Sequence, residues 1–316
     1  MTDPGMGPLL AVALGALQGI AEFLPISSSG HLALAQTWLG VDPAAGGHTF
    51  NIVVHAGTLL AVLMFYRDDL GALVRAVFQR QQVPIVHHEA TPAAPAPEPL
   101  AIAEDLADGP GIRPAPPVDV LPNRVGPPIN TARALLLALI VATLPLAFAL
   151  TDTVETIVVT AEGSTRWIGC GFLLTAALLA FSHRRSDAGL LEAPRPWQGL
   201  VIGLAQLFAI LPGISRSGST MAAAMALGLG RLPAARFSFL LSIPAILGAS
   251  LKETVALIRS DAPLDIEFTS FALGFAASFA VGTLTLRALM RLLVRVGLLP
   301  FVPYLILLGA VVVGSS

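Results

Sequence analysis

The chain has 316 residues, 55% of them hydrophobic and only 12% charged, and its mean hydropathy is +0.78. This composition is too apolar for a water-soluble domain and predicts an integral membrane protein. The net charge of -2 excludes a nucleic-acid partner, which needs a concentrated basic face, and the single cysteine, Cys170, excludes an intrachain disulfide.

Apolar segments predict six membrane-spanning helices and two re-entrant hairpins, in a single all-α membrane domain over residues 1–316. A helix needs about 20 apolar residues to cross a bilayer. The stretches 8–24 and 197–211 instead end at a proline and a turn rich in Ser and Gly, and a second apolar stretch follows each turn. We therefore predict helix-turn-helix hairpins over 8–40 and 197–230. The predicted spans are 50–66, 132–151, 166–182, 237–258, 268–290 and 299–314.

Arginines predict the orientation of the spans, because short loops rich in Arg and Lys stay in the cytoplasm. Arg67, Arg184 and Arg291 follow the first, third and fifth spans. The loops 151–165 and 259–269 are acidic or nearly neutral. We therefore expect these loops and both termini on the outer side of the membrane.

Residues 81–130 are rich in Pro, Ala and acidic residues and show no sustained periodicity. Such a segment buries too little apolar surface to offset the entropy of ordering it, so we predict a disordered cytoplasmic loop. His87 and His88 lie in this loop. We interpret them as a solvated pair and not as a metal site, because no further ligands cluster around them.

An internal repeat relates the two hairpins. Shifted by 188 positions, "ALGALQGIAEFLPISSSGHL" (13–32) aligns with "VIGLAQLFAILPGISRSGST" (201–220). Three predicted spans separate the hairpins, an odd number, so the second hairpin must enter from the face opposite to the first. This is an inverted-topology repeat, in which broken helices meet at a binding site near the midplane. We expect the turns "PISSSGH" and "PGISRSGST" to face each other across one polar cavity.

Two charged residues stand in these hairpins. Glu22 ends the first half-helix, with Gln18 one helical turn earlier. An ionisable residue inside a membrane segment is costly and points to function, and Arg216 is its obvious counter-charge. The alternative is a buried ion pair that only fixes the fold.

Both Ser/Gly turns precede helices, whose N-termini offer free N–H groups and a positive dipole. Together with hydroxyls and a guanidinium, two such N-termini suit a diphosphate. Helix capping is the alternative for most of these serines. The candidate anion-binding residues are Ser27, Ser29, Gly30, Ser215, Ser217, Gly218, Ser219 and Thr220.

His31 follows the first turn directly. A lone histidine on an apolar helix is often a satisfied core residue, but beside a carboxylate, an arginine and serines it can act as a general acid for a phosphate leaving group. We favour the second interpretation. His55 could approach the same cavity but rests on less evidence, and we leave it out of the predicted site.

These residues resemble the bacterial undecaprenyl-diphosphate phosphatase family of the bacitracin-resistance type. The first signature reads Gln18, Glu22 and then "FLPISSSGH", and the second, "PGISRSGST", runs from Pro212 to Thr220. The likeness extends from about residue 8 to the C-terminus, except for the loop 81–130.

The resemblance implies a phosphatase of the bacterial plasma (inner) membrane whose site opens to the outer, periplasmic side. The family releases inorganic phosphate from undecaprenyl diphosphate, which recycles the lipid carrier for peptidoglycan synthesis and gives bacitracin resistance. Divalent cations such as Mg²⁺ or Ca²⁺ assist. The residues that the resemblance marks as catalytic are Glu22, Ser28, His31 and Arg216.

Two mechanisms remain open at this point. Either Ser28 attacks phosphorus while Glu22 or His31 removes its proton, or Glu22 activates a water molecule. We favour Ser28. Many relatives carry a second glutamate at the position of Gln18, whose amide oxygen can ligate a cation but brings no charge. We therefore predict a weakened metal site at Glu22 and Gln18.

Two functions of other classes compete with the phosphatase. Inverted repeats with broken helices are typical of transporters, so the same cavity could carry an anion across the membrane. A purely structural membrane subunit is disfavoured by the buried polar cluster. Helices rich in Gly and Ala are also compatible with a homo-oligomer.

Overall fold

The computed structural model describes residues 7–41, 48–78, 129–183, 191–259 and 267–316. These residues form helices and no β-strand, apart from one isolated bridge between Leu191 and Leu229. The helices are α1 (Pro8–Ala21), α2 (Ser28–Leu39), α3 (His48–Phe65), α4 (Arg67–Phe78), α5 (Ile129–Thr143) with the 3-10 helix η2 (Leu144–Leu150), α6 (Asp152–Glu162), α7 (Thr165–His183), α8 (Pro196–Phe208), α9 (Arg216–Ala226), α10 (Arg231–Arg259), α11 (Phe268–Arg295) and α12 (Phe301–Gly314).

Within the described residues, four helices are long and apolar enough to cross a membrane, and they match four of the predicted spans. A fifth span results if α3 and α4 are taken together, although they are bent by 72°. The remaining predicted span, 299–314, is the 14-residue helix α12, which is shorter than a typical crossing. The all-α membrane fold is thus confirmed, while the count of six full-length spans is not. The four long spans are Thr131–Leu150, Thr165–His183, Arg231–Ala256 and Phe268–Arg295.

One predicted loop is wrong. Most of 151–165, expected as an outer loop, forms helix α6, with Asp152 and Glu155 in its first turn. Acidic residues there interact favourably with the positive end of the helix dipole. The predicted loop 81–130 and its two histidines lie outside the described residues, except that α5 begins at Ile129.

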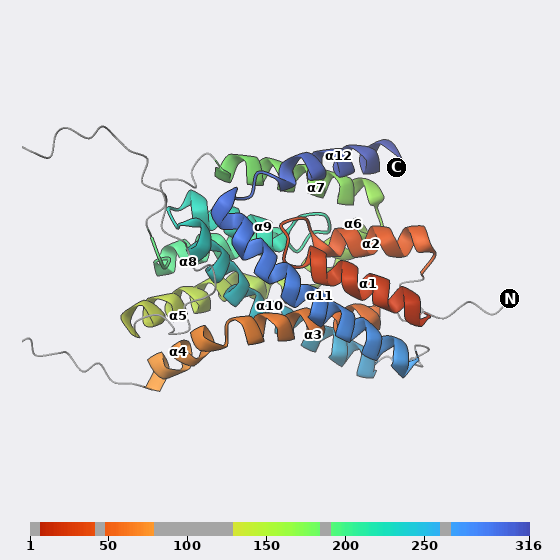
Figure 1. Ribbon diagram of the computed structural model, residues 1–316. Helices are drawn as coiled ribbons and strands as arrows, with labels where there is room; N and C mark the ends of the chain where they lie inside the picture. The colour runs from red at the N-terminus through yellow and green to blue at the C-terminus, as the bar shows by residue number, and fades with distance from the viewer. Residues whose placement is uncertain (1–6, 42–47, 79–128, 184–190, 260–266) are drawn as a thin grey trace, which may run out of the picture.

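Each hairpin breaks where the backbone leaves helical geometry. The first turn contains Pro25 and ends at Ser27, whose φ is 73°. The second contains Pro212 and Gly213, whose φ is 86°. Proline cannot continue the helical hydrogen bonds, and a left-handed residue then reverses the chain. In Figure 1, α1 and α2 lie toward the end where both termini lie, and α8 lies toward the opposite end.

The first helix of each hairpin packs against the opposite half of the chain: α1 against α11, and α8 against α5. A Cβ added at Gly15 would stand 2.4 Å from the carbonyl oxygen of Gly274, and one added at Gly203 would stand 2.2 Å from that of Ala142. Gly15 and Gly203 are equivalent in the repeat. The sequence repeat therefore corresponds to two equivalent helix contacts that interlock the halves.

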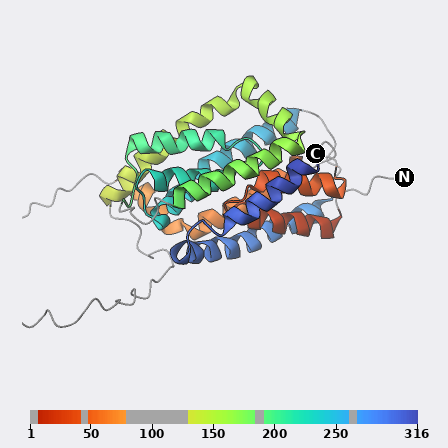
Figure 2. The same ribbon diagram turned by 90° about the horizontal axis from the view of Figure 1, so that it is seen from above.

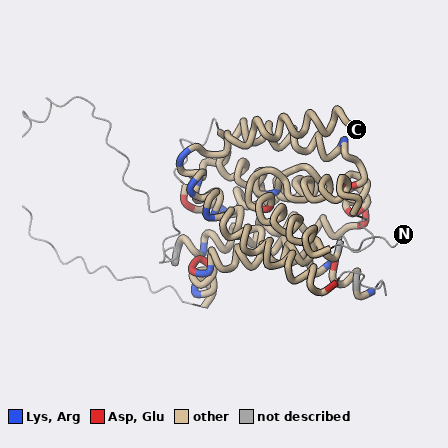
Figure 3. Tube along the Cα trace, turned by 45° about the vertical axis from the view of Figure 1, so that its right-hand side comes forward, with Lys and Arg blue, Asp and Glu red and all other residues tan. Residues whose placement is uncertain are grey.

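Helices α7 and α12 pack side by side and form one face of the bundle, the face toward the viewer in Figure 2. Lys and Arg gather at the end opposite the termini, and Asp and Glu are more frequent at the end of the termini (Figure 3).

We expect Gly15→Ala to lower the free energy of unfolding by about 1–3 kcal/mol, because the added methyl group has no room against the α11 backbone. The midpoint of thermal unfolding in detergent reports this loss of stability. The matched control is Gly248→Ala in α10, where a Cβ meets nothing within 4 Å. Equal midpoints for the two variants would contradict the close packing.

Candidate active site

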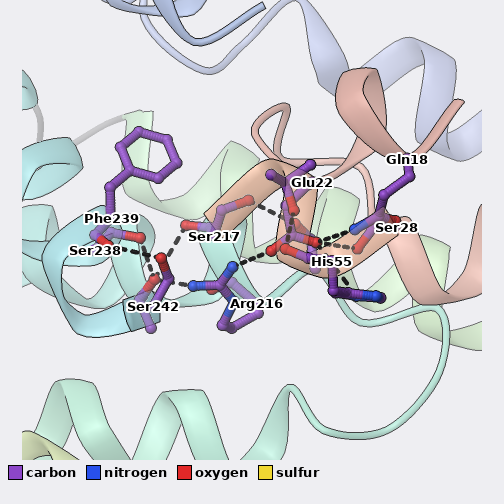
Figure 4. Close-up of polar contacts among 12 residues, drawn as sticks. Gln18, Glu22, Ser28, His55, Arg216, Ser217, Ser238, Phe239 and Ser242 are labelled. Atoms are coloured by element: carbon purple, nitrogen blue, oxygen red, sulfur yellow. Dashed lines mark hydrogen bonds and ion pairs between the residues drawn. The ribbon is translucent and has the colours of Figure 1, made fainter. Parts of the chain in front are cut away.

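Glu22 stands at the centre of a polar cluster inside the apolar bundle. Its side chain is 5% exposed, and four other side chains converge on its carboxylate (Figure 4). Ser28 Oγ donates to Oε2 at 2.7 Å and Gln18 Nε2 donates to the same oxygen at 3.1 Å. Arg216 Nη2 forms an ion pair with Oε1, and His55 Nε2 lies 3.8 Å from Oε2.

The repeat explains how these groups meet. Gln18 precedes Glu22 by one turn on the same face of α1. Ser28 and Arg216 are the first residues of α2 and α9 and are equivalent in the repeat. Each hairpin thus presents the first residue of its second helix to one carboxylate. The guanidinium and the donors offset the cost of burying that charge.

The predicted turns touch each other directly. Ser217 Oγ donates to the carbonyl oxygen of Leu24 at 3.3 Å, and a Cβ at Gly218 would lie 3.2 Å from Pro25. A Cβ at Gly30 would lie 3.0 Å from Cα of Gly213. A Cβ at residue 30 or 218 would therefore be crowded by the opposite turn.

Two of the predicted anion-binding serines act as helix caps. Ser27 Oγ accepts from the N–H of Gly30 at 3.4 Å, and Ser215 Oγ accepts from that of Gly218 at 3.1 Å. Ser217 Oγ lies 3.3 Å from Ser215 Oγ, an arrangement that Ser27 and Ser29 repeat at 3.4 Å. The capping alternative therefore describes Ser27 and Ser215 in this structure.

The other predicted groups differ in accessibility. Ser29 is exposed and Ser28 is half-buried, so the start of α2 is a more exposed edge of the cluster. Thr220 and Ser219 are buried, and Thr220 Oγ1 donates to the carbonyl oxygen of Arg216 at 2.8 Å. Two surface hollows, of about 400 and 630 Å³, lie at the end of α11 and the start of α12 and are lined by none of these residues.

His31 does not contact Glu22 in this structure. Its Nδ1 lies 2.8 Å from the carbonyl oxygen of Ser27, and its Nε2 lies 2.6 Å from the hydroxyl of Tyr304 in α12. Tyr304 was not predicted from the sequence, because a tyrosine in an apolar segment outside both signatures has no local feature that indicates a partner. His55, which was left out of the predicted site, approaches Glu22.

Nη1 of Arg216 has no acceptor in the part of the chain that the structure describes. Nη1 is buried and makes no hydrogen bond to any described residue, as is also true of Gln18 Oε1 and Ser219 Oγ. A buried polar group left unpaired costs about 1–3 kcal/mol, and more when it is charged. A phosphate oxygen is the kind of acceptor that would satisfy a guanidinium nitrogen.

The described residues do not by themselves fit a resident divalent cation. They contain no group of three or more His, Cys, Asp or Glu side chains that could hold a metal ion. Both oxygens of Glu22 already accept hydrogen bonds, and Gln18 turns its N–H toward Glu22.

Comparison with known proteins places these features in a family. The model of the family "Bacitracin resistance protein BacA" matches residues 11–311. The undecaprenyl-diphosphatase of Alcanivorax borkumensis is 39% identical over 303 residues, which cover 95% of each chain. That of Methanosphaera stadtmanae is 35% identical over 309 residues, 96% of each chain, and that of Desulfosudis oleivorans is 35% identical over 308 residues, 97% of each chain.

We expect Arg216→Met to be strongly destabilising, by about 3–5 kcal/mol, because it leaves the buried Glu22 carboxylate without its counter-charge. Adding Glu22→Gln to this variant removes the unpaired charge and should recover part of the loss. Thermal unfolding in detergent compares the two.

The control is Lys252→Met, which breaks the exposed pair of Lys252 with Glu155 and should cost about 0–1 kcal/mol. If the double variant were no more stable than Arg216→Met, burial of the Glu22 charge would not be what Arg216 compensates.

Proposed function

The chain belongs to the BacA family of bacitracin resistance proteins, and we propose that it hydrolyses undecaprenyl diphosphate to undecaprenyl phosphate and inorganic phosphate. Its relatives named undecaprenyl-diphosphatase align over nearly the whole chain. The observation that carries the proposal is the hydroxyl of Ser28, 2.7 Å from a buried carboxylate that also holds an arginine. A hydroxyl paired with a base is the arrangement of an activated nucleophile.

In the proposed reaction, Ser28 Oγ attacks the terminal phosphorus of the diphosphate. The new Oγ–P bond replaces the bond from phosphorus to the bridging oxygen, and undecaprenyl phosphate leaves. Glu22 takes the proton of Ser28. Water then cleaves the Oγ–P bond: its oxygen bonds to phosphorus and Glu22 returns the proton to Oγ, which releases inorganic phosphate and restores both Ser28 and Glu22.

Arg216 and the helix N-termini supply the positive charge that this reaction needs. Most of phosphoryl-transfer catalysis is positioning and stabilisation of negative charge. Nη1 of Arg216 is buried and has no acceptor among the described residues. We propose that it binds an oxygen of the terminal phosphate while Nη2 keeps its contact with Glu22.

The alternative mechanism needs no covalent intermediate. There, Glu22 activates a water molecule and Ser28 only orients the phosphate. The short contact between Ser28 and Glu22 supports the covalent scheme, because the serine hydroxyl already occupies the position that such a water molecule would take on Oε2.

We further propose that the enzyme acts in the bacterial inner membrane with its site open to the periplasmic side, where it recycles the lipid carrier for peptidoglycan synthesis and gives bacitracin resistance. The charge asymmetry in Figure 3 supports this orientation, because basic ends of membrane proteins stay in the cytoplasm. The first hairpin, which carries Glu22 and Ser28, lies toward the opposite end (Figure 1).

The transporter remains a second candidate because equivalent hairpins pack on opposite halves, an arrangement that transporters use to alternate access. Release of inorganic phosphate separates the two functions, since a carrier breaks no bond.

We expect the purified protein to release phosphate from undecaprenyl or farnesyl diphosphate, and Ser28→Ala and Arg216→Ala each to lose at least about 100-fold of this activity. Ser250→Ala in α10 is the matched serine control. A phosphoserine trapped at residue 28 would support the covalent scheme, and a Ser28→Ala variant that is only a few-fold slower would favour water. If the wild-type protein released no phosphate, the phosphatase proposal would be wrong.

Mg²⁺ or Ca²⁺ belongs to the proposal as an ion that enters with the diphosphate, and no step above is routed through it. Gln18→Glu adds a second carboxylate one turn from Glu22, and carboxylate oxygens are preferred ligands of both ions. We expect this variant to reach half-maximal activity at a lower Mg²⁺ concentration than the wild-type protein. An unchanged Mg²⁺ titration would argue against a cation contact at residue 18.

A further inference from the structure

We propose that Tyr304 is a positioning residue for His31: it fixes the tautomer of the imidazole and reserves Nε2 as the atom that exchanges protons. This inference rests on the proposed function and deepens it, because it separates the tasks of His31 and Glu22 in the same site. Tyr304 lies outside both signature motifs.

The hydrogen bonds of His31 determine where its proton lies. Nδ1 is 2.8 Å from the carbonyl oxygen of Ser27, which can only accept, so Nδ1 must carry a hydrogen. In the neutral imidazole, Nε2 is then an acceptor, and the hydroxyl of Tyr304 donates to it at 2.6 Å. When Nε2 gains a proton, the same hydroxyl can accept from it. The hydroxyl of Tyr304 can thus form a hydrogen bond with both the neutral and the protonated imidazole of His31.

The rings hold this geometry. The ring of Tyr304 stacks on that of His31 with centroids 5.8 Å apart and an angle of 15° between the planes, and Phe172 packs against the imidazole at 5.1 Å. His31 is 9% exposed and Tyr304 is 44% exposed. The pair therefore connects a buried imidazole to a side chain at the protein surface.

Close packing of α7 on α12 brings Tyr304 to this position. A Cβ at Gly169 would lie 3.1 Å from the carbonyl oxygen of Gly309, and one at Gly309 would lie 3.0 Å from that of Gly169. The two helix backbones thus approach each other closely. One helix supplies Phe172 and the other Tyr304, so the pair of helices forms the wall that orients His31.

The consequence is a division of tasks. Both nitrogens of His31 are engaged away from Ser28, whose hydroxyl donates to Glu22. Glu22 is then the group that takes the serine proton. His31 is left to give a proton from Nε2, the one nitrogen that is not committed to the backbone, to the leaving oxygen when that oxygen displaces the hydroxyl of Tyr304.

The test is Tyr304→Phe, which keeps the stacked ring and removes only the hydroxyl. We expect kcat for phosphate release to fall about tenfold, part of the 10²–10⁴-fold contribution of a general acid or base. The KM should stay close to that of the wild-type protein, and the pH dependence of kcat should change. The matched control is Tyr66→Phe, because the chain has only two tyrosines and the hydroxyl of Tyr66 contacts Met290 Sδ, away from the site.

A double-mutant cycle shows whether Tyr304 acts through His31. If it does, Tyr304→Phe should cost nothing more in a His31→Ala background. An equal loss in both backgrounds, or a Tyr304→Phe variant with wild-type kcat and pH profile, would overturn the proposal.

A spectroscopic measurement that does not depend on phosphate release completes the experiment. In protein labelled with ¹⁵N-histidine, assigned through His31→Gln, His31 should show the tautomer with hydrogen on Nδ1. Its Nε2 resonance should shift in Tyr304→Phe but not in Tyr66→Phe. Nitrogen shifts that are unchanged in Tyr304→Phe would contradict the positioning role. A wild-type protein that shows these shifts but releases no phosphate would instead contradict the proposed function alone.

Discussion

The buried ion pair between Glu22 and Arg216 is the constraint on which the rest of the site depends. A carboxylate in an apolar bundle is tolerable only if a counter-charge and hydrogen-bond donors surround it. The counter-charge comes from a segment 194 residues away in the chain, and Ser28 and Gln18 supply the donors. The two hairpins must therefore meet, and the glycines at their contacts allow the backbones to approach closely enough.

The repeat supplies a symmetric frame on which the chemistry is asymmetric. The capping serines, Ser27 and Ser215, have the same hydrogen bonds in both hairpins. The groups that we propose to be catalytic differ: the first hairpin contributes the carboxylate and the hydroxyl, and the second contributes the guanidinium. Gln206, the equivalent of Gln18, is buried, and its amide makes no hydrogen bond to any described residue. A glutamate follows Gln18 four residues later, whereas Ile210 follows Gln206, so only the first amide has a carboxylate to hold.

The sequence was sufficient to predict the parts of this structure that are encoded locally. Apolar length identified the long helices α7, α10 and α11, and the repeated turns indicated that Glu22 and Arg216 would meet. Helix α6 was missed because it is polar enough to resemble a loop. The bend between α3 and α4 was missed because the segments on both sides of it favour helix. The contact of His31 with Tyr304 joins residues 273 positions apart, and no local pattern in the sequence records such a pairing.

The choice of arginine over lysine at residue 216 follows from the same geometry. A lysine has a single charged nitrogen and acts as a compact point charge, whereas the guanidinium has two terminal nitrogens in a fixed fork. In this structure Nη2 is on Glu22 and Nη1 is buried without an acceptor among the described residues. One side chain can therefore hold the carboxylate and a phosphate oxygen together. In the proposed mechanism that arrangement keeps Glu22 beside Ser28 while the negative charge of the diphosphate is neutralised, whereas a lysine would have to bring its one nitrogen within reach of both partners.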